Sequence, residues 1–285
     1  MSLKDILVQL DTTEQSASRL ELAADLARRF GAHLTGLHVI DFARPAALAL
    51  ETAAFVDAQQ MDDLMERLRT ASSDRAAKVE AEFRARIERD GIAGEWRLVD
   101  GEVAPTIALH ARYADLVVVG QVDPDHPDRG GGRHVVDQAL LASGRPVLVV
   151  PYAGKFASVG RNVLVGWNAS RESARSLNDA LPILQKAETV TVLAVNAHGG
   201  IAGEGALPAA DIALHLARHG IKVSAAHSSV TEIGEGDELL NRAFESGADL
   251  LVVGGYGHSR ARELVLGGVT RSLLMHMTVP VLMSH

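Results

Sequence analysis

Cysteine is absent from the 285-residue sequence. Its absence excludes a disulfide-stapled scaffold, a zinc site built on thiolates and a cysteine nucleophile. Aromatic residues are scarce at 4%, although hydrophobic residues make up 47% of the chain. The core must therefore be aliphatic, as in parallel sheets that are covered by helices on both faces.

Long apolar runs are also missing, since none approaches the ~20 residues that span a membrane. Residues 1–5 lead directly into a strand pattern, without the apolar region of a signal peptide. The net charge of −8 disfavours non-specific binding to nucleic acid or anionic membranes, because like charges repel. We expect a soluble, cytoplasmic protein that contacts neither nucleic acid nor membrane.

The sequence contains a diverged internal repeat. The repeat is carried by three pairs of segments: Asp115–Gly120 with Asp249–Gly254 and Pro146–Val150 with Pro280–Ser284, both at an offset of 134, and Asp5–Asp11 with Asn162–Asn168 at an offset of 157. The difference between the offsets is absorbed between the second and third strands of the first half, where residues 46–90 form a long helical insert.

Each half alternates short apolar runs with amphipathic stretches, which predicts five strands joined by helical crossovers. The predicted strands lie near 4–10, 33–39, 95–99, 115–120 and 146–150, then 162–167, 189–195, 221–227, 249–254 and 279–283. The predicted helices include 16–30, 174–186, 207–219 and 238–246. This pattern indicates an α/β fold of two domains, each with a five-stranded parallel sheet and helices on both faces. The linker at 152–160 places the domains at 1–154 and 158–285.

The segment Asp249–Thr270 carries the strongest functional pattern. It reads as a buried strand, a glycine turn, a basic linker with Arg260 and Arg262, and a second glycine pair that opens a helix. Glycines let backbone amides approach an anion closely, and a helix N-terminus favours negative charge. The segment therefore predicts a phosphate-binding loop. The arginines either neutralise phosphates or are ordinary surface residues.

The corresponding loop of the first half has lost this pattern. Subtracting 134 from Gly257 and Gly267 gives Asp123 and Arg133. Three carboxylates, those of Asp123, Asp125 and Asp128, stand where phosphates would lie and would repel them. Arg129–Arg133 either binds an anion in another register or is a flexible loop. We expect the first domain to be degenerate for nucleotide, with a structural or regulatory role.

With these features, the chain resembles the universal stress protein family in its tandem two-domain form. The resemblance covers nearly the whole chain and rests on the doubled strand order, the ends of the first strands and the glycine spacing. Nucleotide-binding members carry Gly, two residues, Gly, nine residues, Gly, then Ser or Thr, which Gly254, Gly257 and Gly267 match. The departure is Gly268, which stands where the family has Ser or Thr, although Thr270 could supply a hydroxyl.

The resemblance implies a flavodoxin-like or Rossmann-like fold for each domain, similar to the adenine nucleotide alpha hydrolases. It also implies a site for ATP or another adenine nucleotide, with or without Mg²⁺, at the carboxyl ends of the second half's strands. Asn168 stands where the family places an aspartate near the nucleoside, and the backbone of Val195 matches the adenine-contacting position. The expected site residues are Asn168, Val195, Val253, Gly254, Gly257, His258, Gly267, Gly268, Val269 and Thr270.

The implied function is a stress-response protein that uses nucleotide occupancy as a signal. Two alternatives stay open, a nucleotide-free interaction scaffold with a decayed site and a weak ATPase. No Walker lysine, nucleophile elbow or paired-acid site is present, so we expect no catalytic residue and at most slow ATP hydrolysis.

Several further features have a functional and a structural interpretation. His215 and His219 either share a metal ion or form a solvated helix face, and the three aspartates of the first loop either hold a divalent cation or do not. Met61, Leu64, Met65 and Leu68 form a helical stripe that packs on its own sheet or lines a groove for a partner. We expect the last strands of the two halves to pair as in a dimer, and two chains could associate further.

Overall fold

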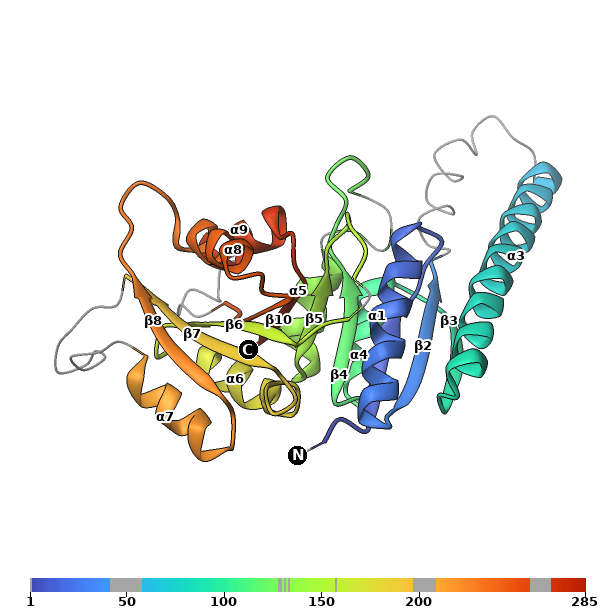
Figure 1. Ribbon diagram of the computed structural model, residues 1–285. Coiled ribbons are helices and arrows are strands. Elements are labelled where there is room, and N and C mark those ends of the chain that lie inside the picture. The colour runs from blue at the N-terminus through green and yellow to red at the C-terminus, as the bar shows by residue number, and fades with distance from the viewer. Residues whose placement is uncertain are drawn as a thin grey trace.

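A computed structural model describes residues 2–41, 58–127, 130, 132, 134–156, 158–196, 209–256 and 268–285. Across these residues the strands form one ten-stranded sheet in the order β3-β2-β1-β4-β5-β10-β9-β6-β7-β8 (Figure 1). The first half contains β1 (Asp5–Gln9), α1 (Gln15–Phe30), β2 (His33–Ile40), α3 (Ala58–Asp90), β3 (Gly94–Asp100), α4 (Val103–Ala111), β4 (Leu116–Gly120), α5 (His134–Ser143) and β5 (Val147–Val150). The second half contains β6 (Asn162–Trp167), α6 (Arg171–Leu184), β7 (Thr189–Val195), α7 (Ala210–Arg218), β8 (Val223–Ser228), α8 (Glu235–Glu245), β9 (Leu250–Gly254), α9 (Gly268–His276) and β10 (Val281–Ser284).

The strand order confirms the predicted fold class. Within each half all neighbouring strands are parallel, and the order third-second-first-fourth-fifth occurs twice. The last strands, β5 and β10, pair antiparallel with Val281 opposite Val149, as expected. This pairing joins the two five-stranded sheets into one and covers an edge that would otherwise expose unpaired backbone groups.

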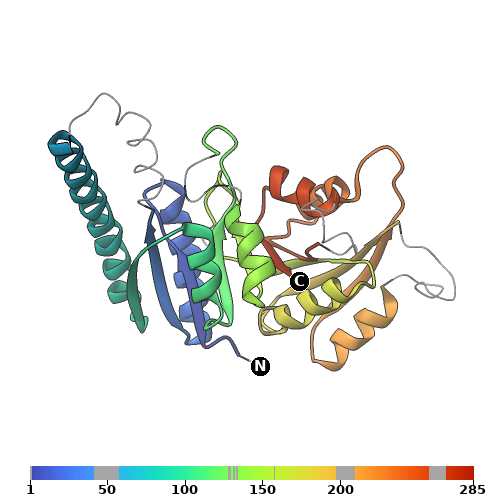
Figure 2. The same cartoon turned by 180° about the vertical axis from the view of Figure 1, so that it is seen from behind.

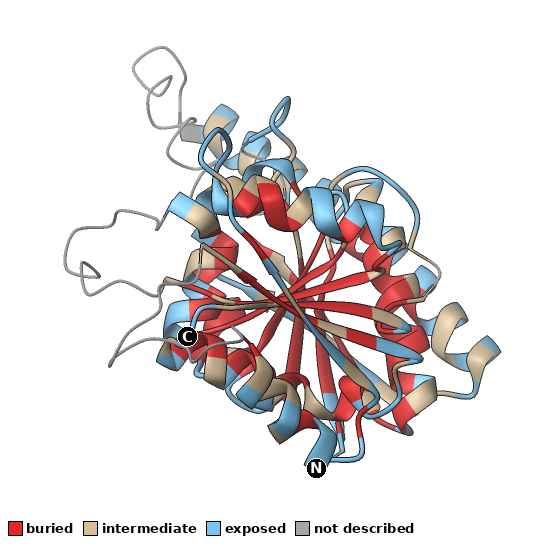
Figure 3. Ribbon diagram, turned by 60° about the vertical axis from the view of Figure 1, so that its left-hand side comes forward, coloured by how far each residue is buried: buried red, intermediate tan, exposed pale blue. Residues whose placement is uncertain are grey.

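Helices cover both faces of the sheet, and the strands between them are buried (Figure 3). The central strands β4 and β9 are buried at every position except their terminal glycines, which explains why their sequences lack alternation. Two aliphatic clusters fill the spaces on the two sides of the sheet. Helices α4 and α5 were not among the predicted helices, because their apolar residues show little periodicity.

The insert helix α3 packs on the sheet, but not through the predicted stripe. Ala76, Val79 and Phe83, in its second half, are buried, and Phe83 lies against the ring of Trp96. Leu64 of the stripe is 39% exposed. The helix runs beyond the sheet at its first end, so the stripe residues cannot all reach the core (Figures 1 and 2).

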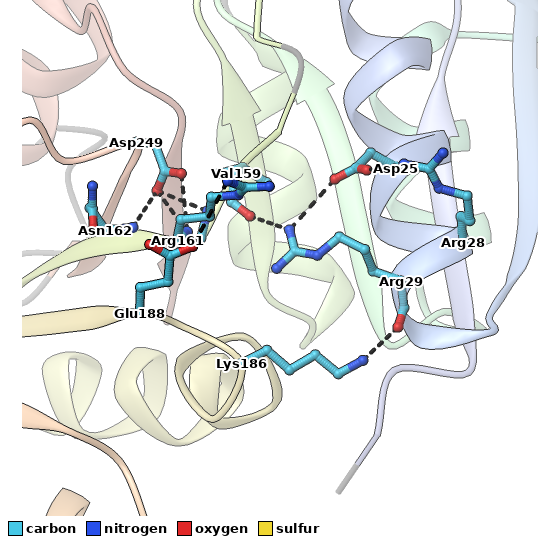
Figure 4. Close-up of polar contacts among 10 residues, drawn as sticks. Asp25, Arg28, Arg29, Val159, Arg161, Asn162, Lys186, Glu188 and Asp249 are labelled. Carbon is cyan, nitrogen blue, oxygen red and sulfur yellow. Dashed lines mark hydrogen bonds and ion pairs between the residues drawn. The ribbon is translucent and has the colours of Figure 1, made fainter.

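A polar joint fastens the two halves at the amino ends of their strands (Figure 4). Arg29 of α1 donates a hydrogen bond from Nη1 to the carbonyl of the buried Val159 in the linker. Lys186 donates from Nζ to the carbonyl of Arg29 at 2.5 Å and lies 4.4 Å from the ring centre of Phe30. Asp249 accepts from the backbone amides of residues 160–162, which fixes where the second half begins.

Candidate functional site

A pocket of about 200 Å³ opens in the second half where β6, β7 and β9 end and α9 begins. Open α/β sheets bind ligands at the carboxyl ends of their strands, at the point where the strand order reverses. Seven of the predicted site residues line this one pocket: Asn168, Val195, Val253, Gly254, Gly268, Val269 and Thr270. Gly257, His258 and Gly267, together with Arg260 and Arg262, lie outside the described residues.

Asn168 takes part in the turn that starts helix α6. Its Oδ1 accepts a hydrogen bond from the backbone amide of Ser170 at 3.2 Å, and Ala169 between them has a left-handed φ of 57°. Ser170 then caps the helix by accepting from the amide of Ser173 at 3.1 Å. Within the described part of the chain, the side-chain nitrogen Nδ2 of Asn168 has no hydrogen-bond partner, so it is free to donate to a ligand.

Two of the predicted glycines that line this pocket, Gly254 and Gly268, serve different purposes. A Cβ at Gly254 would lie 2.5 Å from the amide nitrogen of Ser173, so the close packing of α6 on β9 requires glycine there. A Cβ at Gly268 would meet no atom of the described residues within 4 Å. Packing therefore explains Gly254 without a ligand, whereas it does not explain Gly268.

Helix α9 directs its first turn, Gly268, Val269 and Thr270, into the pocket. The first turn contains no acidic residue, so the partial positive charge of the helix N-terminus is not neutralised from within the helix. The buried Thr270 accepts a hydrogen bond at Oγ1 from the amide of Tyr256 at 3.2 Å. Among the described residues no acceptor takes its hydroxyl proton, which a ligand oxygen could therefore accept.

Six further residues line the pocket that the sequence analysis did not identify: Gly166, Trp167, Ser170, Leu193, Glu235 and Leu239. Four of them lie at the ends of β6 and β7 or just beyond them, where the rule for open α/β sheets could have pointed to them. Glu235 begins helix α8 and is the one acidic or basic side chain among the described lining residues. Its carboxylate would repel a phosphate placed close to it.

The same position in the first half is filled by a buried ion pair. Asp11 corresponds to Asn168, and Arg19 of α1 lies with Nη2 2.5 Å from Asp11 Oδ2, their side chains 4% and 14% exposed. A Cβ at Gly120, the counterpart of Gly254, would collide with the Arg19 guanidinium. The cavity left beside this pair is about 30 Å³.

The charge of Asp11 is stabilised by its neighbours. Burial by itself raises the pKa of the Asp11 carboxyl, but the charge of Arg19 and hydrogen bonds from Thr13 and Gln9 outweigh it, and the pKa lies below its ordinary value. Asp11 is therefore ionised and neutralises Arg19, so the pair offers no net positive charge to an anion.

A second hollow of about 240 Å³ remains in the first half, at the ends of β1 and β2. The insert helix α3 contributes Ser72 and Arg75 to its wall, and Arg75 donates a hydrogen bond to Ser72 Oγ at 3.2 Å. Burial lowers the pKa of His38, which also lines this hollow and whose Nδ1 lies 3.0 Å from the carbonyl of Leu10.

The described residues give no support to a metal site. Among them, no group of three histidine, aspartate or glutamate side chains is arranged to hold an ion. His215 and His219 lie ring to ring, with centres 4.8 Å apart, as a pair without a third ligand from the described chain. In the first half's loop Asp123 accepts from the amide of Asp125, and its other oxygen lies 3.1 Å from His126 Nδ1, while Asp128 lies outside the described residues. No described helix combines the length and apolar character that crossing a membrane requires.

Comparison with known proteins agrees with the doubled architecture. The sequence model of the universal stress protein family matches twice, at residues 2–151 and 160–285. A universal stress protein from Archaeoglobus fulgidus DSM 4304 superposes with a TM-score of 0.71 at 21% identity, over 98% of this chain and 94% of its own. A functionally unknown protein from Pseudomonas aeruginosa PAO1 superposes with a TM-score of 0.55 at 16% identity, over 98% and 92% of the two chains. No curated protein matches the chain. The two family matches together cover almost the entire sequence, and the chain belongs to the universal stress protein family.

Proposed function

We propose that the protein binds ATP or a related adenine nucleotide in the pocket of its second half and uses occupancy of that pocket as a signal. The observation that carries the proposal is the convergence of seven expected residues, from four separate segments of the chain, on one pocket at the carboxyl edge of the sheet. Residues that are 102 positions apart in sequence, Asn168 and Thr270, line the same hollow.

The chemistry of the pocket suits the parts of a nucleotide. Leu193, Val253 and Leu239 supply apolar walls for a base, with the backbone of Val195 at the expected adenine position. The free amide of Asn168 is suited to the ribose, and the first turn of α9 with the Thr270 hydroxyl is suited to a phosphate. Because the described part of the pocket is smaller than the ~300 Å³ typical of complete ligand sites, we expect the phosphates to extend beyond it.

A magnesium ion, if used, would arrive with the nucleotide and be held mainly by its phosphates. The described lining residues include neither lysine nor arginine, and Glu235 is their one carboxylate. Fast phosphoryl transfer needs a positioned water together with stabilisation of the developing charge. We therefore propose binding without designed turnover, and slow hydrolysis at most.

A thermal melt of protein freed of bound ligand tests the proposal. Millimolar ATP with Mg²⁺ should raise the Tm, since a ligand at 100 times its Kd adds about 2.7 kcal/mol to the free energy of unfolding. The control is Gly268→Phe, because residue 268 lines the pocket and a ring on its Cβ, which no described atom approaches within 4 Å, should block it. That variant should melt as the wild type does without ligand and show no response to ATP. An unchanged wild-type Tm would contradict nucleotide binding.

A second candidate is a nucleotide-free scaffold in which the site has decayed. It is favoured by Gly268, which lacks the hydroxyl that the family pattern supplies, and by the carboxylate of Glu235 in the pocket wall. A scaffold would yield no small molecule when the purified protein is analysed by mass spectrometry, and its melt would not respond to ATP. A weak ATPase would instead release phosphate at a rate abolished by Gly268→Phe.

We also propose domain limits of 1–154 and 158–285, a cytoplasmic location and no nucleic-acid partner. The limits are supported by the polar joint around Val159, and the absence of a nucleic-acid partner by the net charge of −8. Because β5 and β10 already pair within one chain, two copies that associate would have to use another surface.

A further inference from the structure

Helix α5 of the first half packs directly against the glycine turn of the second half's pocket. A Cβ at Gly255 would lie 2.5 Å from Cδ2 of the buried Leu140, so a larger residue at position 255 would push the Leu140 side chain aside. One turn earlier on the same face of α5, Asp137 accepts a hydrogen bond at Oδ1 from the hydroxyl of Tyr256 at 2.5 Å. In Figure 2, α5 (light green) stands at the junction of the two halves.

The turn that α5 contacts is otherwise held from within the second half. Tyr256 has a left-handed φ of 59°, a conformation that residues other than glycine adopt only when their surroundings impose it. Its amide donates to Thr270 Oγ1, and the amide of Gly255 donates to the carbonyl of Ser284 at 2.9 Å. His285 Nδ1 lies 3.2 Å from the carbonyl of Gly255. The hydrogen bond that the Tyr256 hydroxyl donates to Asp137 adds a restraint at the end of the Tyr256 side chain.

The hydroxyl of Tyr256 is a dependable donor. Burial, reinforced by Asp137, raises the pKa of Tyr256 well above its ordinary value, so the side chain keeps its proton. The carboxylate of Asp137 makes this a charge-assisted hydrogen bond, which is stronger than one between neutral groups.

The first half's own turn is held in a different way, although the repeat places equivalent residues there. At the offset of 134, Gly255 corresponds to Gln121, Tyr256 to Val122 and Asp137 to Arg271. Gln121 donates from Nε2 to the carbonyl of Leu274 at 2.9 Å and accepts at Oε1 from the amide of Tyr152 at 3.1 Å. Val122 has no hydroxyl for Arg271 to bind. The tyrosine–carboxylate contact is thus specific to the half that has the open pocket.

We propose that Asp137 of the first half is a positioning residue for the ligand pocket of the second half: through Tyr256 it sets the conformation of the glycine turn and the orientation of the Thr270 hydroxyl. The identity of the ligand rests on the proposed function, whereas the restraint on the turn does not. The first half, whose own site is filled by Arg19, then contributes to binding in the other half.

The contact between Tyr256 and Asp137 also couples ligand binding in the second half's pocket to the first half. A phosphate oxygen that accepts the Thr270 hydroxyl proton would orient the same oxygen that holds the Tyr256 amide. Tyr256 in turn donates its hydroxyl hydrogen bond to Asp137 of α5. Because coupling between two sites is reciprocal, weakening the Asp137 contact must weaken ligand binding as much as the ligand strengthens that contact.

The test uses the full chain with Tyr256→Phe, Asp137→Ala and the double variant. Without ligand, hydrogen exchange at the amides of Gly255 and Tyr256 should be faster in each variant than in the wild type. With ATP–Mg²⁺, calorimetry should show the Kd raised about 5- to 10-fold in each single variant. A change of this size corresponds to the free energy that one hydrogen bond contributes. The double variant should bind ATP no more weakly than the single variant with the higher Kd, since both substitutions remove the same contact.

Two controls separate positioning from a general loss of stability. Tyr113→Phe removes a hydroxyl that is part of a 76% exposed residue, and it should change neither exchange at the turn nor the Kd. Asp137→Asn keeps an acceptor oxygen and should recover most of the affinity that Asp137→Ala loses.

The outcomes distinguish this inference from the proposed function. Suppose that the wild type binds nucleotide and that Tyr256→Phe and Asp137→Ala have the same Kd and the same hydrogen exchange as the wild type. That result would overturn the positioning role of Asp137 and leave nucleotide binding intact. Wild-type protein that binds no nucleotide would overturn the proposed function. Faster exchange at the turn in that case would still support the restraint by Asp137, and unchanged exchange would overturn it.

Discussion

Arg19 and Asp11 form a buried ion pair in the first half at the place where the second half has an open pocket. The guanidinium lies against the end of β4, donates from Nε to the carbonyl of Gln9 at 3.0 Å and reaches Asp11 Oδ2 at 2.5 Å. In the second half the offset of 157 places Ser176 at the position of Arg19. A serine side chain cannot reach the strand end, so there the hollow remains open to a ligand.

Removing one partner of this pair should destabilise the protein strongly. Arg19→Met should lower the free energy of unfolding by about 3–5 kcal/mol, because Asp11 would be left charged and buried without its partner. The double variant Arg19→Met, Asp11→Asn should lose much less, since no unpaired charge remains. Urea unfolding of both variants measures this. Equal losses in the two would contradict a coupled pair.

The pair should also contribute to the pH dependence of stability. The pKa of Asp11 is lower in the folded protein than its ordinary value of 3.8. Its contribution is therefore fully present above that ordinary value and is lost as the pH falls through the lower, folded-state pKa. The difference in unfolding free energy between wild type and Asp11→Asn should be constant between about pH 7 and pH 5 and shrink below about pH 4. A difference that stays constant to lower pH would show that Asp11 is not stabilised in its charged form.

Alanine should have different effects on stability at Gly254 and at Gly268, which both line the second half's pocket. Gly254→Ala should lower the free energy of unfolding by about 1–3 kcal/mol, because its Cβ would lie 2.5 Å from the amide of Ser173 and force α6 away from β9. Gly268→Ala meets no atom and lies in a helix, so it should leave stability unchanged or raise it by up to about 1 kcal/mol. Thermal or urea unfolding compares the two directly.

Restoring the family's hydroxyl at position 268 should strengthen nucleotide binding. Gly268→Ser places a donor in open space at the N-terminus of α9, where it can reach a phosphate. We expect the Kd for ATP to fall about 3- to 10-fold, the worth of one additional hydrogen bond. Gly268→Ala is the matched control, because it adds the Cβ without the hydroxyl. Equal affinities of the serine and alanine variants, measured by calorimetry, would show that the hydroxyl makes no contact.

The joint between the halves should depend on Arg29 more than on its neighbour. Arg29→Ala removes the donor to the buried carbonyl of Val159, together with an ion pair to Asp25 at 3.5 Å, and should cost about 1–3 kcal/mol of unfolding free energy. Arg28→Ala removes an arginine side chain that is 58% exposed and pairs with Asp25, and should cost less than about 0.5 kcal/mol. A loss in Arg28→Ala as large as that in Arg29→Ala would mean that Asp25, rather than Val159, is the important partner.

The sequence by itself determined the fold class and its duplication. Unbroken aliphatic runs such as Leu250–Val253 can be buried only between two layers of helices, and their recurrence at a fixed offset implies two copies of one sheet. Right-handed crossovers then limit the possible orders of the parallel strands, and the structure gives the order. The glycine spacing and the family resemblance also predicted a set of site residues, and seven of them line one pocket, because the ends of parallel strands meet at one edge of the sheet.

Tertiary structure alone decided what fills each site and what supports it. Arg19 is an ordinary helix residue in sequence, and only the crossing of α1 over the end of β4 places it in the first half's site. Glu235 lines the second half's pocket because α8 begins there. The hydrogen bond between Tyr256 and Asp137 joins residues that are 119 positions apart and lie in different halves. Periodicity and spacing report which face of an element is buried. They do not report which side chain from another element occupies the space opposite, because that depends on how the elements pack in three dimensions.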